Sequence, residues 1–566
     1  MQKTKIAIFD LTGCDGCEFN LFSLNEILLD VFQNFEIVNW RLLKENEKTK
    51  ADFDVAFIEG AVTTEEQIAL LKQIRETSQI VVAMGACAIS GNIFAELSPI
   101  QRKKLAQKIY NKNYKLKAKF LHPVEKYIKV DEKIQGCPAN TEKFKELIDK
   151  VGGTRVTSKI KDVPLPDYTA KIEGHGVLTI NFKKKAAKFE VAESERLVEG
   201  LLLGKSYIQA PFITSRICGI CPTAHNLCSL SAIENAFSIQ VSQETIILRQ
   251  LLSAAQTIKS HMLHLFFLAL PDYAGLKSSI ELSTKYPAEF HSMLNVKKVA
   301  DELLTVIGGT SAFPTDTTVG GFIKPVDIKQ LLAISTEISN VIDEAQDFIS
   351  LFNDIKTPDL NVNTKLATIT PRTKSYPFYL GTFTQTIKEV VQAHSTAKLG
   401  LLGNKVIKTG ALARLNYYSD NLAIRAKKAF KNINLDLKNP FNNNTAQTVE
   451  ILHLLENSMA LIDKLINKNL KNSVVVTEQK LPRKIVSGQA ALEAPRGILI
   501  HKVKISPQGT ILSYNITPPT QINLASLEKE AQKLIKQQKN LSQEEVKKQI
   551  QELIRAFDPC ITCAVH

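Results

Sequence analysis

The sequence lacks three features that would place it in a membrane or outside the cell. It has no apolar run of about 18 to 20 residues, the length that a membrane-spanning helix needs. Its first residues, Lys5-Ile6-Ala7-Ile8-Phe9-Asp10, are typical of a buried strand and not of a signal peptide. Nine cysteines in 566 residues are too few for the disulfide framework of a secreted protein. We therefore predict a cytoplasmic protein without a membrane span, whose thiols are available as ligands.

The positive charge of the chain has no nucleic-acid signature. The formal net charge is +14, and lysines are spread along the whole sequence. The two densest runs, at residues 103–119 and 183–185, lack the interleaved aromatic side chains on which single strands stack. We therefore predict a solvated basic surface and no nucleic-acid partner. Such a surface would suit an acidic, ferredoxin-like protein.

The pattern of apolar residues divides the chain into two domains. Residues 1–152 alternate strands, at 5–10, 54–59 and 79–85, with helices at 19–32 and 64–76, which predicts an α/β domain with a flavodoxin-like parallel sheet. Residues 153–165 contain Gly, Pro and Lys without periodicity and are predicted to be a linker. Residues 166–566 begin with short strands at 177–180 and 188–191. Amphipathic helices follow at 227–237, 243–270, 299–307, 328–352 and 446–468, so we predict a large, mainly α (α+β) domain.

Four cysteines fall in the first domain: Cys14, Cys17, Cys87 and Cys137. The first two follow the first predicted strand and the third follows another, so the carboxyl ends of parallel strands bring them to one edge of the sheet. Ligands scattered over loops of an open sheet favour an iron–sulfur cluster over structural zinc. The glycines beside these thiols leave room for a bulky inorganic core.

The other four cysteines of interest form two pairs, Cys218/Cys221 and Cys560/Cys563, each followed closely by a histidine, His225 or His566. Four thiolates around one centre are compatible with zinc, an iron–sulfur cluster or nickel, and the spacing alone does not choose among them. The site would join the start of the second domain to its end. Three charged residues lie near this set in the sequence, each equally readable as a surface salt-bridge residue: Glu173, Arg496 and Asp558. The ninth cysteine, Cys228, is predicted to be a small buried residue.

The motifs around these cysteines resemble those of nickel–iron hydrogenases. Two segments are similar to the paired nickel-binding motifs of the large subunit: Arg216-Ile217-Cys218-Gly219-Ile220-Cys221-Pro222-x-x-His225 and Asp558-Pro559-Cys560-x-x-Cys563-x-x-His566. Three are similar to the small subunit: Thr12-Gly13-Cys14-Asp15-Gly16-Cys17-Glu18, Gly85-Ala86-Cys87 and Gly136-Cys137-Pro138. The resemblance spans nearly the whole chain and is nearest to the sulfhydrogenase-type branch, whose partners use nicotinamide cofactors. It implies that both subunits are fused here.

The resemblance implies a role for each residue of the two sets. Cys218, Cys221, Cys560 and Cys563 would bind nickel, with Cys221 and Cys563 bridging to an iron that carries carbonyl and cyanide ligands. Glu173 would be a proton gate beside the terminal thiolate of Cys560, and Arg496 would overhang the open metal position. His225 and Asp558 would orient the thiolates and Arg496. Glu199 and His566 would hold Mg²⁺ or Fe²⁺, and the N-terminal four would hold one [4Fe-4S] cluster.

The chain also departs from the family pattern. No cysteine lies between Cys137 and Cys218, so one cluster is the limit, and a partner must approach the edge of that cluster closely or bring its own clusters to it. Thr310 and Phe313 stand where the family often has arginine and histidine, and Lys171 where arginine is usual. The family's C-terminal extension is absent after His566, so we expect a form that is already mature or needs no trimming.

The predicted function is reversible oxidation of H2 to protons and electrons. The implied partners are hydrogenase maturation proteins and an electron carrier, either ferredoxin-like or an iron–sulfur or flavin subunit linked to NAD(P). Two alternatives are a non-catalytic scaffold or electron-transfer homologue, against which the retained cysteines and Arg496 argue, and an H2-sensing homologue. Sulfur reduction by the same assembly is a further activity compatible with the branch.

Overall fold

The structure is a computed structural model that describes residues 3–45, 50–51, 53–152, 161–162, 166–467 and 481–565. Its N-terminal part is built on a five-stranded sheet in the order β2-β1-β4-β5-β6, with every neighbouring pair parallel. The elements of this part are β1 (Thr4–Asp10), α1 (Gly16–Leu21), η1 (Phe22–Leu24), α2 (Glu26–Asn34), β2 (Phe35–Trp40), β3 (Lys50–Ala51), β4 (Phe53–Glu59), α3 (Glu65–Thr77), β5 (Ser78–Met84), α4 (Gly85–Ser90), η2 (Asn92–Glu96), α5 (Pro99–Ile109), η3 (Val124–Lys126), β6 (Glu132–Ile134) and α6 (Thr141–Val151). The predicted parallel sheet is confirmed.

Two local predictions for this part were wrong. The single helix predicted at 19–32 is three pieces, because Asn25 has φ 50° and interrupts the helical backbone between η1 and α2. Asparagine is one of the few residues that adopt positive φ at low cost. The edge strand β2 was not predicted, since the polar residues Glu36 and Asn39 dilute its apolar pattern.

The second part has a helical layer of long amphipathic and buried helices. The prediction that residues 243–270 are helical is confirmed, although the helix changes to a π-helix after Leu263. The helices and short strands up to residue 353 are β7 (Lys161–Asp162), β8 (Gly176–Asn181), β9 (Ala186–Val191), α7 (Val198–Leu201), η4 (Tyr207–Gln209), α8 (Ala210–Ser215), α9 (Pro222–Phe237), α10 (Gln243–Leu263), η5 (His264–Ala269), α11 (Leu270–Tyr273), η6 (Ser279–Glu281), α12 (Leu282–Lys285), α13 (Pro287–Gly308), β10 (Thr317–Thr318), β11 (Gly321–Phe322) and α14 (Ile328–Asn353).

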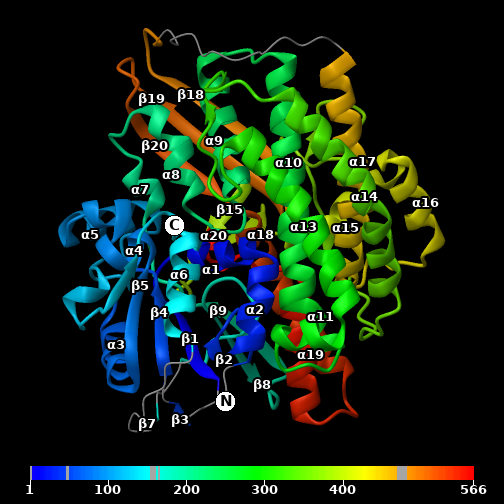
Figure 1. The fold of residues 1–566 in the computed structure, drawn as a ribbon. Coiled ribbons are helices and arrows are strands. Elements are labelled where there is room, and N and C mark those ends of the chain that lie inside the picture. Colours follow the sequence, from blue (N-terminus) through cyan, green and yellow to red (C-terminus); the bar gives the residue numbers. More distant parts are fainter. Residues whose placement is uncertain are drawn as a thin grey trace.

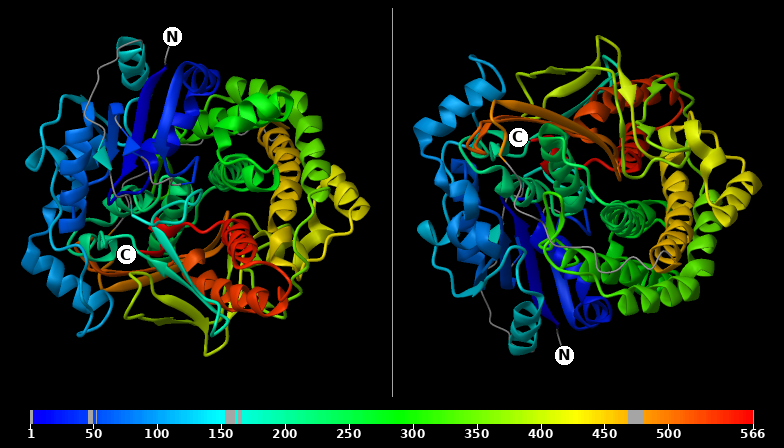
Figure 2. Two further views of the ribbon diagram at one scale, coloured as in Figure 1. Left: turned by 90° about the horizontal axis from the view of Figure 1, so that it is seen from below. Right: turned by 90° about the horizontal axis from the view of Figure 1, so that it is seen from above.

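A five-stranded sheet with antiparallel pairing, in the order β13-β14-β18-β19-β20, was missed by the sequence prediction. Its strands β18 and β19 pack against α9, and β18, β19 and β20 are the orange strands in Figure 2. The remaining elements are β12 (Lys365–Leu366), β13 (Thr370–Pro371), β14 (Leu380–Thr382), β15 (Ile387–Val390), β16 (Leu399–Leu402), β17 (Ile407–Lys408), α15 (Ala411–Tyr418), η7 (Ser419–Asn421), α16 (Ile424–Asn432), η8 (Pro440–Asn442), α17 (Asn443–Asn467), β18 (Val486–Ala494), β19 (Gly497–Ile505), β20 (Ile511–Thr517), α18 (Pro519–Gln537), α19 (Gln543–Ala556) and α20 (Ile561–Ala564).

The two parts share one hydrophobic core. Phe22 of η1 packs on Phe267 of η5 with ring centroids 4.4 Å apart, and both belong to the largest buried cluster. Figure 1 shows α1 and α20 meeting in the middle of the molecule, between the sheet of the first part and the helices of the second. The predicted linker, 153–165, lies outside the described residues except for β7. Among the described helices, none is long and apolar enough to cross a bilayer.

Candidate metal centre

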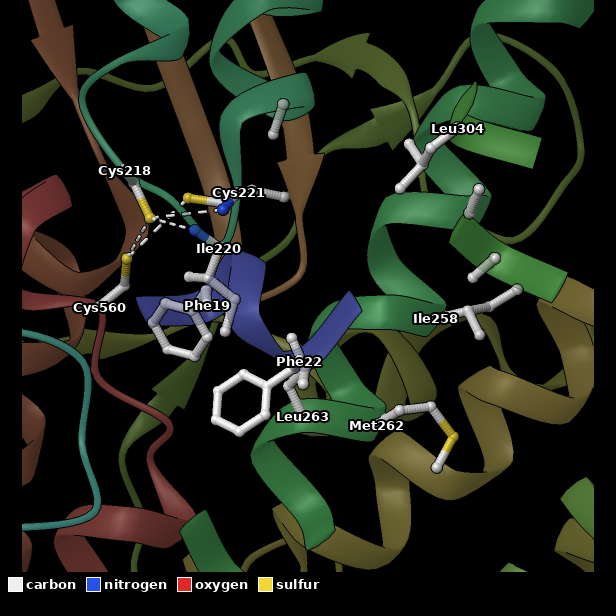
Figure 3. Close-up of a cluster of buried hydrophobic side chains, with 14 of the residues drawn as sticks. Phe19, Phe22, Cys218, Ile220, Cys221, Ile258, Met262, Leu263, Leu304 and Cys560 are labelled. Atoms are coloured by element: carbon white, nitrogen blue, oxygen red, sulfur yellow. Dashed lines mark hydrogen bonds between the residues drawn. The ribbon is translucent and has the colours of Figure 1, made fainter. Parts of the chain in front are cut away.

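Four buried sulfur atoms converge at the centre of the molecule. The Sγ atoms of Cys218, Cys221, Cys560 and Cys563 all lie within 4.8 Å of one another. The shortest separations are 2.9 Å for Cys560–Cys563, 3.0 Å for Cys221–Cys563 and 3.1 Å for Cys218–Cys560. In Figure 3 the side chains of Cys218, Cys221 and Cys560 turn toward one another, above Phe19 of α1.

The local backbone explains why these thiols meet. Cys221 is the N-cap of α9 and Pro222 begins that helix, so the preceding turn folds back and directs the amides of Ile220 and Cys221 at the sulfur of Cys218, 3.3 Å away. Cys560 caps the short helix α20, which brings Cys563 to the same side. Cys218 and Cys560 are 342 residues apart along the chain, so the site joins two distant segments.

The donor set fits a thiolate-bound metal centre. All four cysteines are at most 4% exposed. In a tetrahedral zinc site, metal–sulfur bonds of about 2.3 Å put the sulfurs about 3.8 Å apart, and thiolates suit nickel as well. The four thiols therefore fit a metal, and the distances between them do not select which one.

Glu173 lies beside this cluster with no exposed surface. Its main chain pairs with that of Cys560, and its Oε1 lies 3.8 Å from the sulfur of Cys218. The carboxylate also accepts the Thr562 amide at 3.0 Å and the Thr562 hydroxyl. Glu173 thus lies beside both residues, with its main chain against Cys560 and its carboxyl group within reach of Cys218, and its role as a proton gate stays a prediction. Burial, together with negative charge at Cys218 and Asp15, raises the pKa of Glu173 well above its usual value.

Arg496 is buried, and each of its three guanidinium nitrogens donates a hydrogen bond. Its Nε donates to the carbonyl of Asp558 at 2.9 Å, its Nη2 to the Asp558 carboxylate at 2.6 Å and its Nη1 to the Ser260 hydroxyl at 2.8 Å. Burial alone would lower the pKa of Arg496, but Asp558 and the nearby thiols raise it. Arg496 is therefore a fixed positive charge beside the thiols and not a surface salt-bridge residue.

His225 contacts the cluster from α9. Its Nε2 lies 3.4 Å from the sulfur of Cys563, and its Nδ1 lies 3.2 Å from Nε2 of His501. His501 in turn contacts the Tyr514 hydroxyl at 2.9 Å. Burial lowers the pKa of His225 to about 4, so its ring is neutral at pH 7.

The four N-terminal cysteines are arranged more openly. Asn92 places its amide nitrogen 3.7 Å from the sulfur of Cys87 and 3.4 Å from that of Cys137, and the amide of Ala139 points at Cys17 from 3.4 Å. Among these four described thiols, no three lie within the 4.8 Å that brings the other set together. A Cβ on Gly85 would lie 2.3 Å from the sulfur of Cys17. The wide spacing of the four sulfurs, the N–H donors directed at them and the glycine beside Cys17 fit a polynuclear cluster better than a single metal ion.

Of the predicted magnesium ligands, only Glu199 is described. It is buried, and its Oε1 accepts the Ile516 amide at 2.6 Å and the Asn515 side chain at 3.2 Å. Burial raises its pKa to about 7. His566 lies outside the described residues, so this site stays a prediction.

The three residues that depart from the family pattern make contacts of their own. Phe313 is buried under the guanidinium of Arg216, 5.0 Å from the ring centroid. The Thr310 hydroxyl donates to the Phe313 carbonyl at 2.8 Å, and Lys171 pairs with Asp272 and Glu45.

Several residues at the site were not predicted from the sequence. Ser260 lies in the middle of a helix, Thr562 between two cysteines, and Asp15 within the first cysteine motif, where its carboxylate accepts the Gly174 amide at 2.7 Å. Only the three-dimensional contact identifies Ser260, whereas Asp15 and Thr562 sit inside motifs that were already singled out.

Known protein families match the N-terminal part and the rest of the chain separately. The family "NADH ubiquinone oxidoreductase, 20 Kd subunit" matches residues 14–151. Sulfhydrogenase 1 subunit alpha of Pyrococcus furiosus is 29% identical over 436 residues, which are 72% of this chain and 99% of that protein. Sulfhydrogenase 2 subunit delta of the same organism is 33% identical over 158 residues, covering 27% of this chain and 65% of that protein.

Solved structures show the same fold. A crystal structure of an NAD⁺-reducing [NiFe]-hydrogenase superimposes with a TM-score of 0.62 at 22% identity, covering 70% of this chain and 98% of that one. The family described as "Nickel-dependent hydrogenase" matches residues 196–291 and 372–566, more than half of the sequence and both pairs of converging cysteines. The chain therefore belongs to the nickel-dependent hydrogenases, oxidoreductases that act on H2, with small-subunit and large-subunit regions joined in one polypeptide.

Proposed function

We propose that this chain catalyses H2 ⇌ 2H⁺ + 2e⁻ at a nickel–iron centre held by Cys218, Cys221, Cys560 and Cys563. The observation that carries the proposal is the convergence of these four buried sulfurs beside a buried arginine. When bound, such a centre, with carbonyl and cyanide on its iron, supplies the Lewis-acidic metal needed to polarise and split H2. The domain division that goes with this proposal is 1–152 for the small-subunit region and 166–566 for the catalytic region.

The residues of the chain provide the base. A cysteine thiolate is the better proton acceptor than Arg496, because Asp558 holds the guanidinium in its charged form. Glu173 then takes the proton: its Oε1 is 3.8 Å from the sulfur of Cys218. Burial and the nearby negative charge raise the pKa of this carboxyl group, which favours its protonated form. Arg496 remains as the fixed charge that closes the site.

Electrons leave by a separate route. We infer that Cys14, Cys17, Cys87 and Cys137 hold one [4Fe-4S] cluster. The carbonyl of Cys14 accepts the amide of Gly219 at 2.7 Å, so the cluster loop is in direct contact with the residue that follows Cys218. Cys87 and Cys137 are the partly exposed members, which makes their edge the exit. The acceptor is an electron carrier or a partner iron–sulfur or flavin subunit, either ferredoxin-like or NAD(P)-linked. Dedicated maturation proteins would insert the nickel.

The proposal is tested by metal analysis and activity on one anaerobically matured preparation. We expect about one nickel per chain, infrared bands from carbonyl and cyanide, about four further irons and H2-dependent dye reduction. Cys563→Ser should lose nickel and activity. Cys228→Ser is the matched control, since Cys228 is equally buried but lies outside the four-thiol group, with its sulfur directed at the carbonyls of Ala490 and Leu499.

Zinc in place of nickel, without the infrared bands, would overturn the proposal and favour the non-catalytic alternative. Nickel and the infrared bands with only slow turnover would favour an H2 sensor.

A further inference from the structure

Arg414 of α15 uses all five of its N–H donors although it is only 2% exposed. Its Nε and Nη2 both donate to the Glu450 carboxylate at 2.6 Å, and its Nη1 donates to Glu493 at 2.9 Å. The two remaining donors bind main-chain carbonyls, Ala494 at 3.0 Å and Pro495 at 2.9 Å. These are the two residues immediately before Arg496. Arg414 therefore holds the backbone on which Arg496 is carried.

The two carboxylates are held in turn. Glu450, on α17, also accepts the Tyr376 hydroxyl at 2.6 Å and contacts Nε2 of His261 at 2.9 Å. Glu493 accepts the amide of Ile369 at 3.0 Å and the hydroxyl of Thr368 at 2.6 Å. Every charge of the group is buried and paired, the condition under which a buried ion network fixes one geometry.

The same group fixes both partners of Arg496. His261, bound to Glu450, is the neighbour in α10 of Ser260, whose hydroxyl accepts from Arg496. Gln447 lies one turn before Glu450 on α17, so the two share a face of the helix, and its amide donates to the Asp558 carboxylate at 3.1 Å. The carbonyl of Arg496 itself accepts from Asn523 at 3.3 Å. The Arg496 loop, the helix α10 that carries Ser260, and the acidic partner Asp558 are thus all linked to α17 by hydrogen bonds.

We propose that Arg414, Glu450 and Glu493 form a clamp that positions Arg496 over the four-thiol site. They are positioning residues, because none of them touches the thiols. This inference rests on the proposed function only for its catalytic consequence; the clamp itself is a property of the metal-free protein. A displacement of about 1 Å in a group that closes an active site can lower turnover on the order of 100-fold.

The clamp is tested first without metal, by a double-mutant cycle on the thermal unfolding of Arg414→Lys, Arg496→Ala and the double variant. Lysine keeps the charge but cannot make the five-donor fork. We expect the loss of Tm in the double variant to be clearly smaller than the sum of the two single losses, because Arg496 is already released when Arg414 is replaced. Tyr376→Phe, which removes one hydroxyl from Glu450, serves as a milder partner and should give a smaller deviation of the same sign.

Arg249→Lys is the matched control. Arg249 is as buried as Arg414 and makes a two-point bond to Glu234. It lies on α10, the helix that carries Ser260, but it does not touch the Arg496 loop. The losses of Tm caused by Arg249→Lys and by Arg496→Ala should be additive in the double variant. Additive losses for Arg414→Lys as well, or a crystal structure of Arg414→Lys in which Arg496 still donates to Asp558 and Ser260, would overturn the clamp.

In metal-loaded protein, Arg414→Lys should keep its nickel and lose kcat on the order of 100-fold, with Arg249→Lys close to the unchanged protein. Undiminished kcat in Arg414→Lys would also overturn the clamp. If the unchanged protein has no hydrogenase activity, the metal-free cycle still decides the clamp, and the proposed function alone fails.

Discussion

At the scale of single residues, the distinctive arrangement is a carboxyl group placed within reach of a thiol and sealed from water. Glu173 touches Cys218 through its side chain and Cys560 through its main chain. Thr562 donates to the same carboxylate from within the second cysteine pair. Glu173 therefore contacts both cysteine pairs of the four-thiol site.

Replacing Glu173 by Gln should leave the metal content unchanged and lower H2-dependent dye reduction by about 100-fold or more, because the amide cannot accept and release a proton. Nickel analysis on the same sample checks the first expectation. Glu173→Asp is the companion variant: it keeps the acid on a shorter side chain and should recover part of the rate. Equal rates for Glu173→Gln and the unchanged protein would exclude Glu173 from the proton route.

The sequence sufficed for residues that sit in compact motifs. Each cysteine pair is compact, and His225 follows Cys221 closely, so each motif could be recognised from the sequence. Ser260 and Gln447 could not be found this way, because a lone polar residue in a long helix has many readings. The contact between the Glu173 carboxyl group and Cys218 could not be predicted either, since spacing carries no information on which sulfur a carboxyl group reaches.

At the scale of elements, the long helices predicted in the second part are present, whereas α18, α19 and the second sheet were not predicted. The helix α14 follows its predicted range within one residue because its apolar positions repeat at helical spacing. The strand β18, with the sequence Val-Ser-Gly-Gln-Ala-Ala-Leu-Glu-Ala, contains a single β-branched residue and ends in five consecutive buried positions. Its strand conformation is imposed by pairing with β19 and packing on α9, which no local pattern reveals.

The helix α17 carries a pH dependence through Glu450. Burial alone would raise the pKa of this carboxyl group, but Arg414 and His261 lower it from 4.5 to about 2. The folded state then binds fewer protons than the unfolded state between these values, so stability is fully present above pH 4.5 and is lost as the pH falls toward 2. The difference corresponds to about 3 kcal/mol.

Acid unfolding of the metal-free protein tests this directly. Glu450→Gln should be less stable at pH 7, since it breaks the pair with Arg414, and should lose less stability between pH 4.5 and 2 than the unchanged protein does. The exposed Glu142→Gln should follow the unchanged curve. A Glu450→Gln curve parallel to that of the unchanged protein would mean that this carboxylate does not titrate with folding.

At the scale of the whole molecule, the two halves meet through backbone and not only through side chains. The amide of Gly219 donates to the carbonyl of Cys14. A Cβ on Gly219 would lie 2.2 Å from Cα of Gly16 and 2.5 Å from its nitrogen. Since both atoms belong to the main chain, neither can move aside as a flexible side chain would. The contact between the loop of Cys14 and the loop of Cys218 therefore requires glycine at 219.

Gly219→Ala should separate these loops and lower the free energy of unfolding of the metal-free protein by about 3 kcal/mol or more, beyond an ordinary overpacking change. Gly321→Ala is the control: its added Cβ would meet nothing nearer than 3.6 Å, so its Tm should stay near that of the unchanged protein.

In metal-loaded protein we further expect Gly219→Ala to keep both metal sites if it folds, yet to transfer electrons to a dye more slowly, because the loops that join the two sites have moved apart. Thermal unfolding and single-turnover reduction of the cluster by H2 measure the two effects separately. Equal Tm losses in the two variants, with unchanged cluster reduction, would show that the halves communicate through some other contact.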